Sequence, residues 1–389
     1  MIYRVNIEVI SLYIHIPFCR SKCAYCDFLS FRAGRDECRE YVSALISELS
    51  FYRGESIRTL YIGGGTPTFL EETQLARLFE AIQRLFDLSK TEECTIEANP
   101  ESLSARKVNI FLNGCVNRVS LGVQSFDNRV MKTMQRPTRK RHTWHSVSLL
   151  RTAGIGNIGL DLILGVQKED QYKKDLDTVL KIMPAHISVY MLHIGSGTPL
   201  ERMVKTGRFT PMGEQAYERL YVVTVDMLSD AGYSSYELSN FAQPRYECRH
   251  NINYWEGGGY IGAGLGAVST IGAERTKNAC SMRDYIRHIR AGTLPVTWRE
   301  HLGERELRVE KLMLSLRMSK GLPVCELYGL AQTARRGLVR TFIEQLEHLG
   351  YAVRRRDRLS LSTSGIMRSD FIVTELLRAV EGEPNRYFS

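Results

Sequence analysis

The sequence predicts an α/β fold built on a parallel sheet with crossover helices. Short apolar or β-branched runs alternate with amphipathic stretches through roughly the first 200 residues. The alternation repeats six times at spacings of about 25 to 45 residues, which is typical of strand–helix units. Six right-handed units can close, or partly close, into a barrel. An open doubly wound sheet is the alternative, and hydrophobic periodicity does not separate the two.

The individual elements follow from these two patterns. Residues 72–86, for example, place Leu75, Leu78, Phe79 and Ile82 on one helical face. The expected strands are residues 11–16, 59–62, 95–98, 118–123, 159–164 and 186–192. The expected helices between and after them are residues 36–53, 72–86, 102–113, 138–153 and 171–183.

The second half of the chain has a different residue pattern. After a helix expected at residues 212–231, the segment 233–270 is rich in Tyr, Asn and Gly and predicts irregular backbone. A compact, winged-helix-like unit is expected after residue 295, and we interpret it as a packing or interaction domain because it shows no strongly basic recognition helix. Its expected helices are residues 305–319, 331–338, 339–349 and 370–380, with strands at 351–356 and 358–362.

Composition narrows the class of protein. The chain has 389 residues, 43% hydrophobic and 24% charged, which excludes collagen, coiled coil and disorder. Its net charge of +9 is spread along the chain, so it permits an anionic partner without requiring nucleic acid. No apolar run reaches the roughly 18 residues of a membrane span. Arg4 and Glu8 interrupt the apolar start, which makes a poor signal-peptide core, so we expect a cytoplasmic protein.

Three of the nine cysteines lie within eight residues. An odd count without an export signal argues against a disulfide scaffold. Cys19, Cys23 and Cys26 follow the first strand, at the functional end of a βα barrel. Three thiolates can hold three irons of a 4Fe–4S cluster and leave the fourth iron open. Zinc is the alternative, but a structural zinc site takes four ligands, and no second knuckle exists. The remaining cysteines are interpreted as small buried or half-buried hydrophobes: Cys38, Cys94, Cys115, Cys248, Cys280 and Cys325.

With this Cys-x-x-x-Cys-x-x-Cys spacing, the sequence resembles the radical S-adenosylmethionine superfamily, and YIHIPFC at residues 13–19 is similar to its coproporphyrinogen-dehydrogenase-related branch. The resemblance covers nearly the whole chain. It implies a partial (β/α)6 barrel that carries the cluster, in which one electron cleaves S-adenosylmethionine into methionine and a 5′-deoxyadenosyl radical. The implied domains are a core barrel at 1–235, a connecting segment at 236–294 and a C-terminal domain at 295–389.

The resemblance also implies which residues bind S-adenosylmethionine. Gly64, Gly65 and Thr66, in a Gly-Gly-Thr-Pro segment, would contact its ammonium group. Arg136 suits its carboxylate through a charge-assisted pair. The polar residues Glu97, Gln124 and Asp161 would contact the ribose hydroxyls and the sulfonium or amino end. Tyr13 and Tyr25 would line the site, with simple packing as the alternative for Tyr25.

Two departures distinguish the branches. Oxygen-independent coproporphyrinogen dehydrogenases carry a fourth cysteine where this chain has Phe28, and they have a longer N-terminal extension than the 18 residues before Cys19. In both respects the sequence resembles the HemW-type haem chaperones, which lack that dehydrogenase activity. Other departures from the family pattern are Val166 and Gln167, where Leu-Pro is usual, and Gly195, where Glu is often found.

A second motif supports the chaperone branch. His250-Asn251-x-x-Tyr254-Trp255 matches a pattern of the HemW group. The imidazole of His250 can ligate haem iron, with loop packing as the alternative. We therefore expect a protein that binds a 4Fe–4S cluster, S-adenosylmethionine and haem, and that passes haem to a haemoprotein, including a membrane-associated one. A homodimer is a candidate assembly and nucleic acid is not an expected partner. The alternatives are a coproporphyrinogen III dehydrogenase or other radical enzyme, and a structural 4Fe–4S protein.

Overall fold

The computed structural model describes residues 9–331 and 335–381. These residues belong to two compact units, which group the chain differently from the predicted limits at 235 and 294. Those domain limits therefore stay a prediction. Unit 1 comprises Met1–Met212, Cys248–His250 and Gly259–His301, and unit 2 comprises Gly213–Glu247, Asn251–Gly258 and Leu302–Ser389.

Unit 1 is built on the six predicted strands, all of which are confirmed. They pair in parallel and in sequence order, from β1 to β6. A doubly wound sheet would reverse its order at a switch point, so the sequential order identifies the barrel-type alternative. The barrel is partial because β1 pairs on its other side with β9 (Tyr260–Ala263) instead of β6. The strands are β1 (Ile10–Ile16), β2 (Ile57–Gly64), β3 (Glu93–Ala98), β4 (Arg118–Gln124), β5 (Asn157–Leu164) and β6 (His186–Met191).

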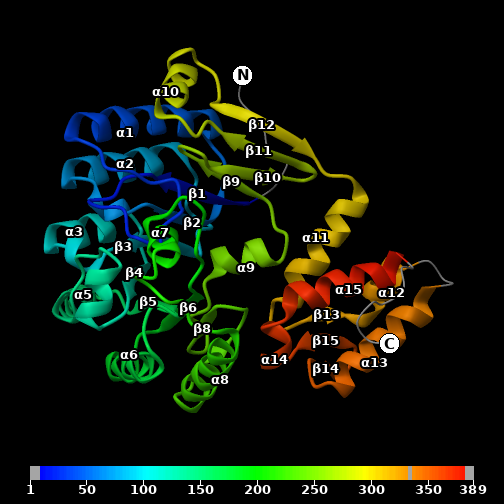
Figure 1. Ribbon diagram of the computed structural model, residues 1–389. Coiled ribbons are helices and arrows are strands. Elements are labelled where there is room, and N and C mark those ends of the chain that lie inside the picture. The colour runs from blue at the N-terminus through cyan, green and yellow to red at the C-terminus, as the bar shows by residue number, and fades with distance from the viewer. Residues whose placement is uncertain (1–8, 332–334, 382–389) are drawn as a thin grey trace. The chain divides into compact units, whose positions relative to one another are not determined.

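Five predicted helices cover the outer side of these strands (Figure 1). They are α1 (Arg35–Leu49), α2 (Glu72–Leu85), α3 (Ala105–Asn113), α5 (Lys140–Thr152) and α6 (Glu169–Ile182). Two further short helices, α4 (Asn128–Thr133) and α7 (Pro199–Lys205), were not predicted. Each had a capping signal, because the side chains of Asp127 and Thr198 accept hydrogen bonds from first-turn amides. Single 3-10 turns are η1 (Ser50–Tyr52), η2 (Pro67–Phe69) and η3 (Pro100–Ser102).

The prediction that residues 233–270 form irregular backbone is wrong in part. The segment contains β9, and antiparallel strands continue the sheet beyond it. These strands are short, and β9 finds its partner β1 far away in sequence, so local composition concealed it. The further elements are β7 (Ser234–Ser235), β8 (Asn240–Ala242), α9 (Arg249–Trp255), β10 (Val268–Ile271), β11 (Glu274–Asn278), α10 (Met282–Arg290) and β12 (Val296–His301).

A buried carboxyl group attaches this extension to the barrel. Glu48 of α1 is fully buried and accepts hydrogen bonds from the Gly264 amide (2.8 Å), the Asn278 amide (2.6 Å) and the Tyr285 hydroxyl. Burial raises the pKa of Glu48 to about 7, although these hydrogen bonds oppose the shift. The strand, loop and helix that supply the three donors are therefore held to α1 by one side chain.

Unit 2 contains the expected helices and strand pair. The predicted helix at 212–231 is confirmed as α8 (Glu214–Asp230), and an apolar core around Leu327, Phe342 and Leu376 packs the C-terminal helices. The predicted break at residue 338 is wrong, because 336–348 form one helix; residues 332–334 lie outside the described residues. The remaining elements are α11 (Glu304–Leu316), β13 (Leu322–Pro323), α12 (Val324–Leu330), α13 (Arg336–His348), β14 (Ala352–Arg355), β15 (Arg358–Leu361), α14 (Thr363–Ile366) and α15 (Ser369–Glu381).

Within the described ranges, no helix is both long and apolar enough to cross a membrane.

Candidate functional site

The cysteine loop lies between β1 and α1 and is closed at its base by backbone hydrogen bonds. The Cys19 amide donates to the Phe31 carbonyl (3.0 Å), and the Phe31 amide donates to the Pro17 carbonyl (2.9 Å). These bonds make a short parallel bridge between the two ends of the loop. The loop therefore leaves the carboxyl end of β1 as a fixed excursion, which is the position expected for a functional loop of a βα barrel.

The two unpredicted helices hold the middle of the same loop. The Ala24 amide donates to the carbonyl of Met134, just after α4, and the Leu200 amide of α7 donates to the Ala24 carbonyl. Ala24 is fully buried and packs with Met134 and Leu200 in a small apolar cluster. The loop between the cysteines is thus fixed by elements that follow β4 and β6.

Cys19 and Cys26 each lie near a hydroxyl group. The Sγ atom of Cys19 is 3.5 Å from Oγ1 of Thr66, and that of Cys26 is 3.9 Å from Oγ of Ser30. Burial raises the pKa of both thiols, so a bound cation is needed to favour their thiolate forms. Among the described residues, no three His, Cys, Asp or Glu side chains are arranged to hold one metal ion.

The remaining cysteines agree with the sequence interpretation only in part. Cys38, Cys94 and Cys248 are buried and Cys115 is half-buried, as expected of bystanders. Cys280 and Cys325 are exposed, so their interpretation as buried or half-buried hydrophobes is wrong.

Arg136 lies beside Cys23, the second cysteine of the motif. Its Nη1 donates to the Cys23 sulfur (3.4 Å) and to the Tyr25 hydroxyl (3.3 Å), while Nη2 donates to Asn99 Oδ1 (2.8 Å) and the Gly122 carbonyl. The remaining nitrogen of the guanidinium, Nε, is buried and has no hydrogen-bond partner among the described residues. Protein atoms therefore occupy both Nη groups, and the guanidinium contributes a buried positive charge to the site.

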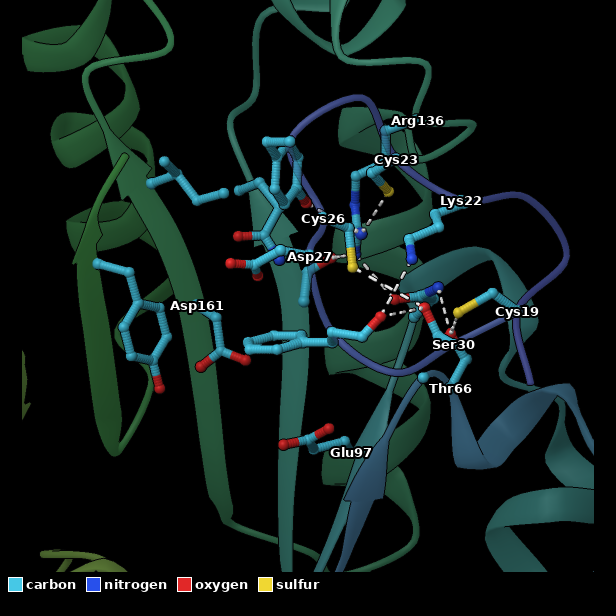
Figure 2. A pocket seen from close by; sticks show the side chains of 18 of the residues that line it. Cys19, Lys22, Cys23, Cys26, Asp27, Ser30, Thr66, Glu97, Arg136 and Asp161 are labelled. Atoms are coloured by element: carbon cyan, nitrogen blue, oxygen red, sulfur yellow. Dashed lines mark hydrogen bonds between the residues drawn. The ribbon is translucent and has the colours of Figure 1, made fainter. Parts of the chain in front are cut away.

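A cavity of about 490 Å³ opens beside these residues. It gathers eleven of the thirteen predicted site residues, and only Tyr13 and His250 lie outside its wall. Figure 2 shows the three cysteine sulfur atoms toward one side and the carboxylates of Glu97 and Asp161 away from them. The predicted residues in its lining are Cys19, Cys23, Tyr25, Cys26, Gly64, Gly65, Thr66, Glu97, Gln124, Arg136 and Asp161.

Two carboxyl groups give the cavity a polar end. Glu97 accepts hydrogen bonds from the Tyr61 hydroxyl (2.7 Å) and the Gly64 amide (3.1 Å), and Asp161 accepts one from the Ser120 hydroxyl (3.0 Å). Burial raises the pKa of Glu97 to about 7 and also raises that of Asp161. Near neutral pH, Glu97 can therefore either donate to a ligand oxygen or accept from a ligand hydroxyl or ammonium group.

Backbone features at two strand ends shape the cavity wall. Gln124 has a positive φ of 69°, and the pairing register of β4 with β5 shifts between Gly122 and Gln124. Such irregularities cost energy and are common at functional sites. At the end of β2, a Cβ on Gly65 would lie 2.8 Å from the Phe18 carbonyl oxygen. Only glycine therefore lets this segment pack against the start of the cysteine loop.

Sequence reasoning missed several polar residues of the site. Asn99 bridges Arg136 and the Thr66 hydroxyl, to which its amide donates at 3.1 Å. Ser30 and Ser120 also line the cavity. Asn99 follows Glu97 by two residues at the end of a strand, and that position was the available signal. The serines carried no signal, because isolated serines are common everywhere in loops and strands.

The loop after β5 is anchored in spite of its departure from the family pattern. Gln167 is buried and donates through its side-chain amide to Asp175 (2.9 Å). The same carboxylate accepts from the Ser125 hydroxyl (2.6 Å) and the Phe126 amide (2.9 Å). Gln167 thus ties the loop after β5 to the loop after β4, and Val166 beside it is buried.

The structure places His250 in the closed interior of unit 1. Its side chain is fully buried, stacks on Tyr61 with ring centroids 5.1 Å apart, and its Nδ1 is 2.8 Å from Oγ1 of Thr59. Burial lowers the pKa of His250 to about 3, with a further contribution from Arg118. His250 therefore packs in the interior and does not line the cavity, as the packing alternative expects, and haem ligation by His250 stays a prediction. Tyr13 likewise contacts His15 and Tyr61 instead of lining the cavity.

Comparison with known proteins identifies the family of this chain. A family model described as "Radical SAM superfamily" matches residues 13–180. The chain is 35% identical over 316 residues to the "Heme chaperone HemW" of Lactococcus lactis subsp. lactis (strain IL1403), which covers 81% of this chain and 83% of that protein. It is 32% identical over 375 residues to the "Heme chaperone HemW" of Mycobacterium tuberculosis (strain ATCC 25618 / H37Rv), which covers 94% of each.

A solved structure shares the fold. The structure described as "Coproporphyrinogen III oxidase (HemN) from Escherichia coli is a Radical SAM enzyme" matches with a TM-score of 0.82, covering 96% of this chain and 91% of that one. At 21% identity this likeness shows the fold alone. The relatives that match at 32% identity or more along most of their length carry the assignment. With its three-cysteine loop at the carboxyl end of a partial barrel, this chain belongs to the HemW family of the radical SAM superfamily.

Proposed function

We propose that this protein is a haem chaperone that holds a 4Fe–4S cluster and S-adenosylmethionine, binds haem and delivers it to a haemoprotein. The observation that carries the proposal is the single cavity that joins three cysteines of one loop to a buried arginine and two buried carboxyl groups. Thiols suit iron, and the mixed charges suit the zwitterionic end and the ribose of the nucleoside. Bystander cysteines in an apolar core would not face such a set.

The residues of this chain have distinct tasks in the proposal. Cys19, Cys23 and Cys26 would hold three irons, and Arg136 would stabilise the negative charge beside Cys23. When bound and reduced, the cluster supplies the electron that cleaves the S–C5′ bond of S-adenosylmethionine. Glu97, doubly hydrogen-bonded and near its pKa at neutral pH, would bind hydroxyl or ammonium groups of that ligand.

The chaperone activity rests on the position of Phe28 and on the family. Phe28 lines the cavity where related dehydrogenases carry a cysteine, so no fourth thiol is available there. Relatives named haem chaperones match most of the chain. We propose a cytoplasmic protein with haem and a haemoprotein acceptor as partners, the acceptor including a membrane-associated one, and a homodimer as a candidate assembly.

Three measurements on one anaerobic preparation test the function. Reconstituted protein should carry about four irons per chain. Addition of the protein should shift the Soret band of hemin. Coproporphyrinogen III, with dithionite and S-adenosylmethionine, should remain unconverted. Turnover of coproporphyrinogen III would instead establish the dehydrogenase, and iron binding without any hemin shift would also contradict the chaperone assignment.

A further inference from the structure

The mouth of the cysteine cavity carries two exposed aromatic rings and one exposed imidazole. Phe28 is 67% exposed and Tyr190 is 44% exposed, and the side chain of His193 is 79% exposed. All three line the same cavity as the cysteines. Among the large hydrophobic side chains of the described residues, Phe28 is the most exposed. We call these three residues the aromatic mouth; exposed apolar groups gathered at a cavity mark a binding site for an apolar ligand.

We propose that the aromatic mouth is the haem site of this protein and that His193 is the axial ligand of the iron. The proposal rests on the proposed haem chaperone function and names the site at which it acts. A porphyrin presents a flat apolar face, which Phe28 and Tyr190 can cover by stacking. Its iron takes a neutral imidazole as an axial ligand.

His193 is the histidine with access to this cavity. In the part of the chain that the structure describes, it is the one histidine in the cavity wall. The interior histidines His15, His186 and His250 are all buried. A haem iron can reach His193 without any rearrangement of the barrel, whereas the interior residues would have to leave their packing. Access therefore selects His193 from among the histidines near the barrel.

A carboxylate lies beside His193, within ion-pair range but beyond hydrogen-bond distance. Oδ2 of Asp27 lies 3.8 Å from Nε2 of His193. Carboxylates next to metal-binding imidazoles orient the ring and raise its basicity, and they leave the other nitrogen for the metal. Gly195 makes room for this carboxylate, because a Cβ there would lie 2.8 Å from Cβ and 2.9 Å from Oδ2 of Asp27. Nδ1 of His193 is accordingly the nitrogen assigned to iron.

Lys22 supplies a positive charge at the same mouth. It lines the cavity, and its ammonium group donates to the Phe28 carbonyl at 3.1 Å. That bond fixes the turn that presents Phe28. The remaining donors of the exposed ammonium group can pair with a haem propionate.

The test separates the iron ligand from the apolar surface. Full-length, cluster-loaded protein is titrated with hemin and, in parallel, with metal-free protoporphyrin. His193→Ala should weaken hemin binding at least tenfold, abolish the spectrum of imidazole-ligated iron and leave protoporphyrin binding unchanged. Phe28→Ser should weaken the binding of both porphyrins. His145→Ala, at an exposed position of α5, is the matched control and should change neither.

Added imidazole should restore the ligated-iron spectrum in His193→Ala, which distinguishes a lost ligand from a distorted fold. Wild-type hemin affinity and an unchanged spectrum in His193→Ala would overturn the assignment while leaving the chaperone function in place. Failure of the wild-type protein to bind hemin would defeat the proposed function and this site together.

Discussion

The open cavity and the closed interior of unit 1 use the same types of residue for different ends. In the interior, His250 and Glu48 are fully buried, and both form hydrogen bonds with other protein groups. In the cavity, Arg136 keeps a buried Nε without a protein partner, and the cysteines face a void of about 490 Å³. Access, rather than residue type, therefore separates the functional polar groups from the structural ones.

The largest expected effect contrasts a cavity cysteine with an exposed one. Cys26→Ser should reduce the iron content of reconstituted protein from about four per chain to near zero, because the cluster loses a thiolate ligand. Cys280→Ser, outside the cavity, should retain full iron content. Iron and sulfide analysis, with the visible absorbance of the cluster, checks both variants. Equal iron in the two variants would erase the contrast between cavity and bystander cysteines.

The second prediction concerns the interior. His250→Ala should lower the free energy of unfolding by about 3 kcal/mol, because it creates a cavity and removes one of the two hydrogen-bond partners of Thr59 Oγ1. Denaturant titration of the variant beside His145→Ala measures the loss. Under conditions in which the variant remains folded, it should still bind hemin. Loss of hemin binding without loss of stability would make His250 a ligand after all.

A third prediction uses the buried Glu48. Its pKa is about 7 in the folded protein and 4.5 in its unperturbed state, so between these values the unfolded chain releases a proton that the folded chain keeps. The free energy of unfolding should therefore fall as pH rises from about 4.5 to 7, by on the order of 3 kcal/mol from this residue. Glu48→Gln should flatten that slope, and Glu80→Gln, exposed on α2, should not. Identical slopes in all three proteins would refute the assignment.

The smallest expected effect concerns Arg136. Arg136→Lys keeps the charge but loses the planar group that reaches Asn99, Tyr25 and Cys23. We expect about tenfold weaker binding of S-adenosylmethionine to cluster-loaded protein, or about 1.4 kcal/mol. Equilibrium dialysis checks this against Arg141→Lys, an exposed change on α5. An affinity equal to wild type would remove Arg136 from the proposed ligand site.

The barrel strands were predictable because each is a continuous apolar run with its partner in the next unit of the chain. Strands β9 to β12 were not. Strands β9 and β10 have four residues each, β9 pairs with the distant strand β1, and β12 is mostly exposed, so none of them forms a long apolar run. The hydrophobic pattern therefore identified the six parallel strands but not the extension, and the partial barrel was implied by the family resemblance.

Residue positions at strand ends explain why most of the predicted residues meet in one cavity. Glu97, Gln124 and Asp161 each end or face inward from a predicted strand, so a barrel necessarily brings them together. The burial of His250 was not predicted, because a motif reports residue types without reporting burial. The hydroxyl of Thr59 and the ring of Tyr61, which enclose it, lie almost two hundred residues earlier.

The most direct test of the account is the electron paramagnetic resonance spectrum of the reduced, reconstituted protein before and after addition of S-adenosylmethionine. If Cys19, Cys23 and Cys26 hold three irons and leave the fourth open for S-adenosylmethionine, the reduced protein should give a 4Fe–4S signal whose g values shift when the ligand binds. The signal should be absent from Cys26→Ser. A cluster signal that S-adenosylmethionine leaves unchanged, or a signal that persists in Cys26→Ser, would contradict the account.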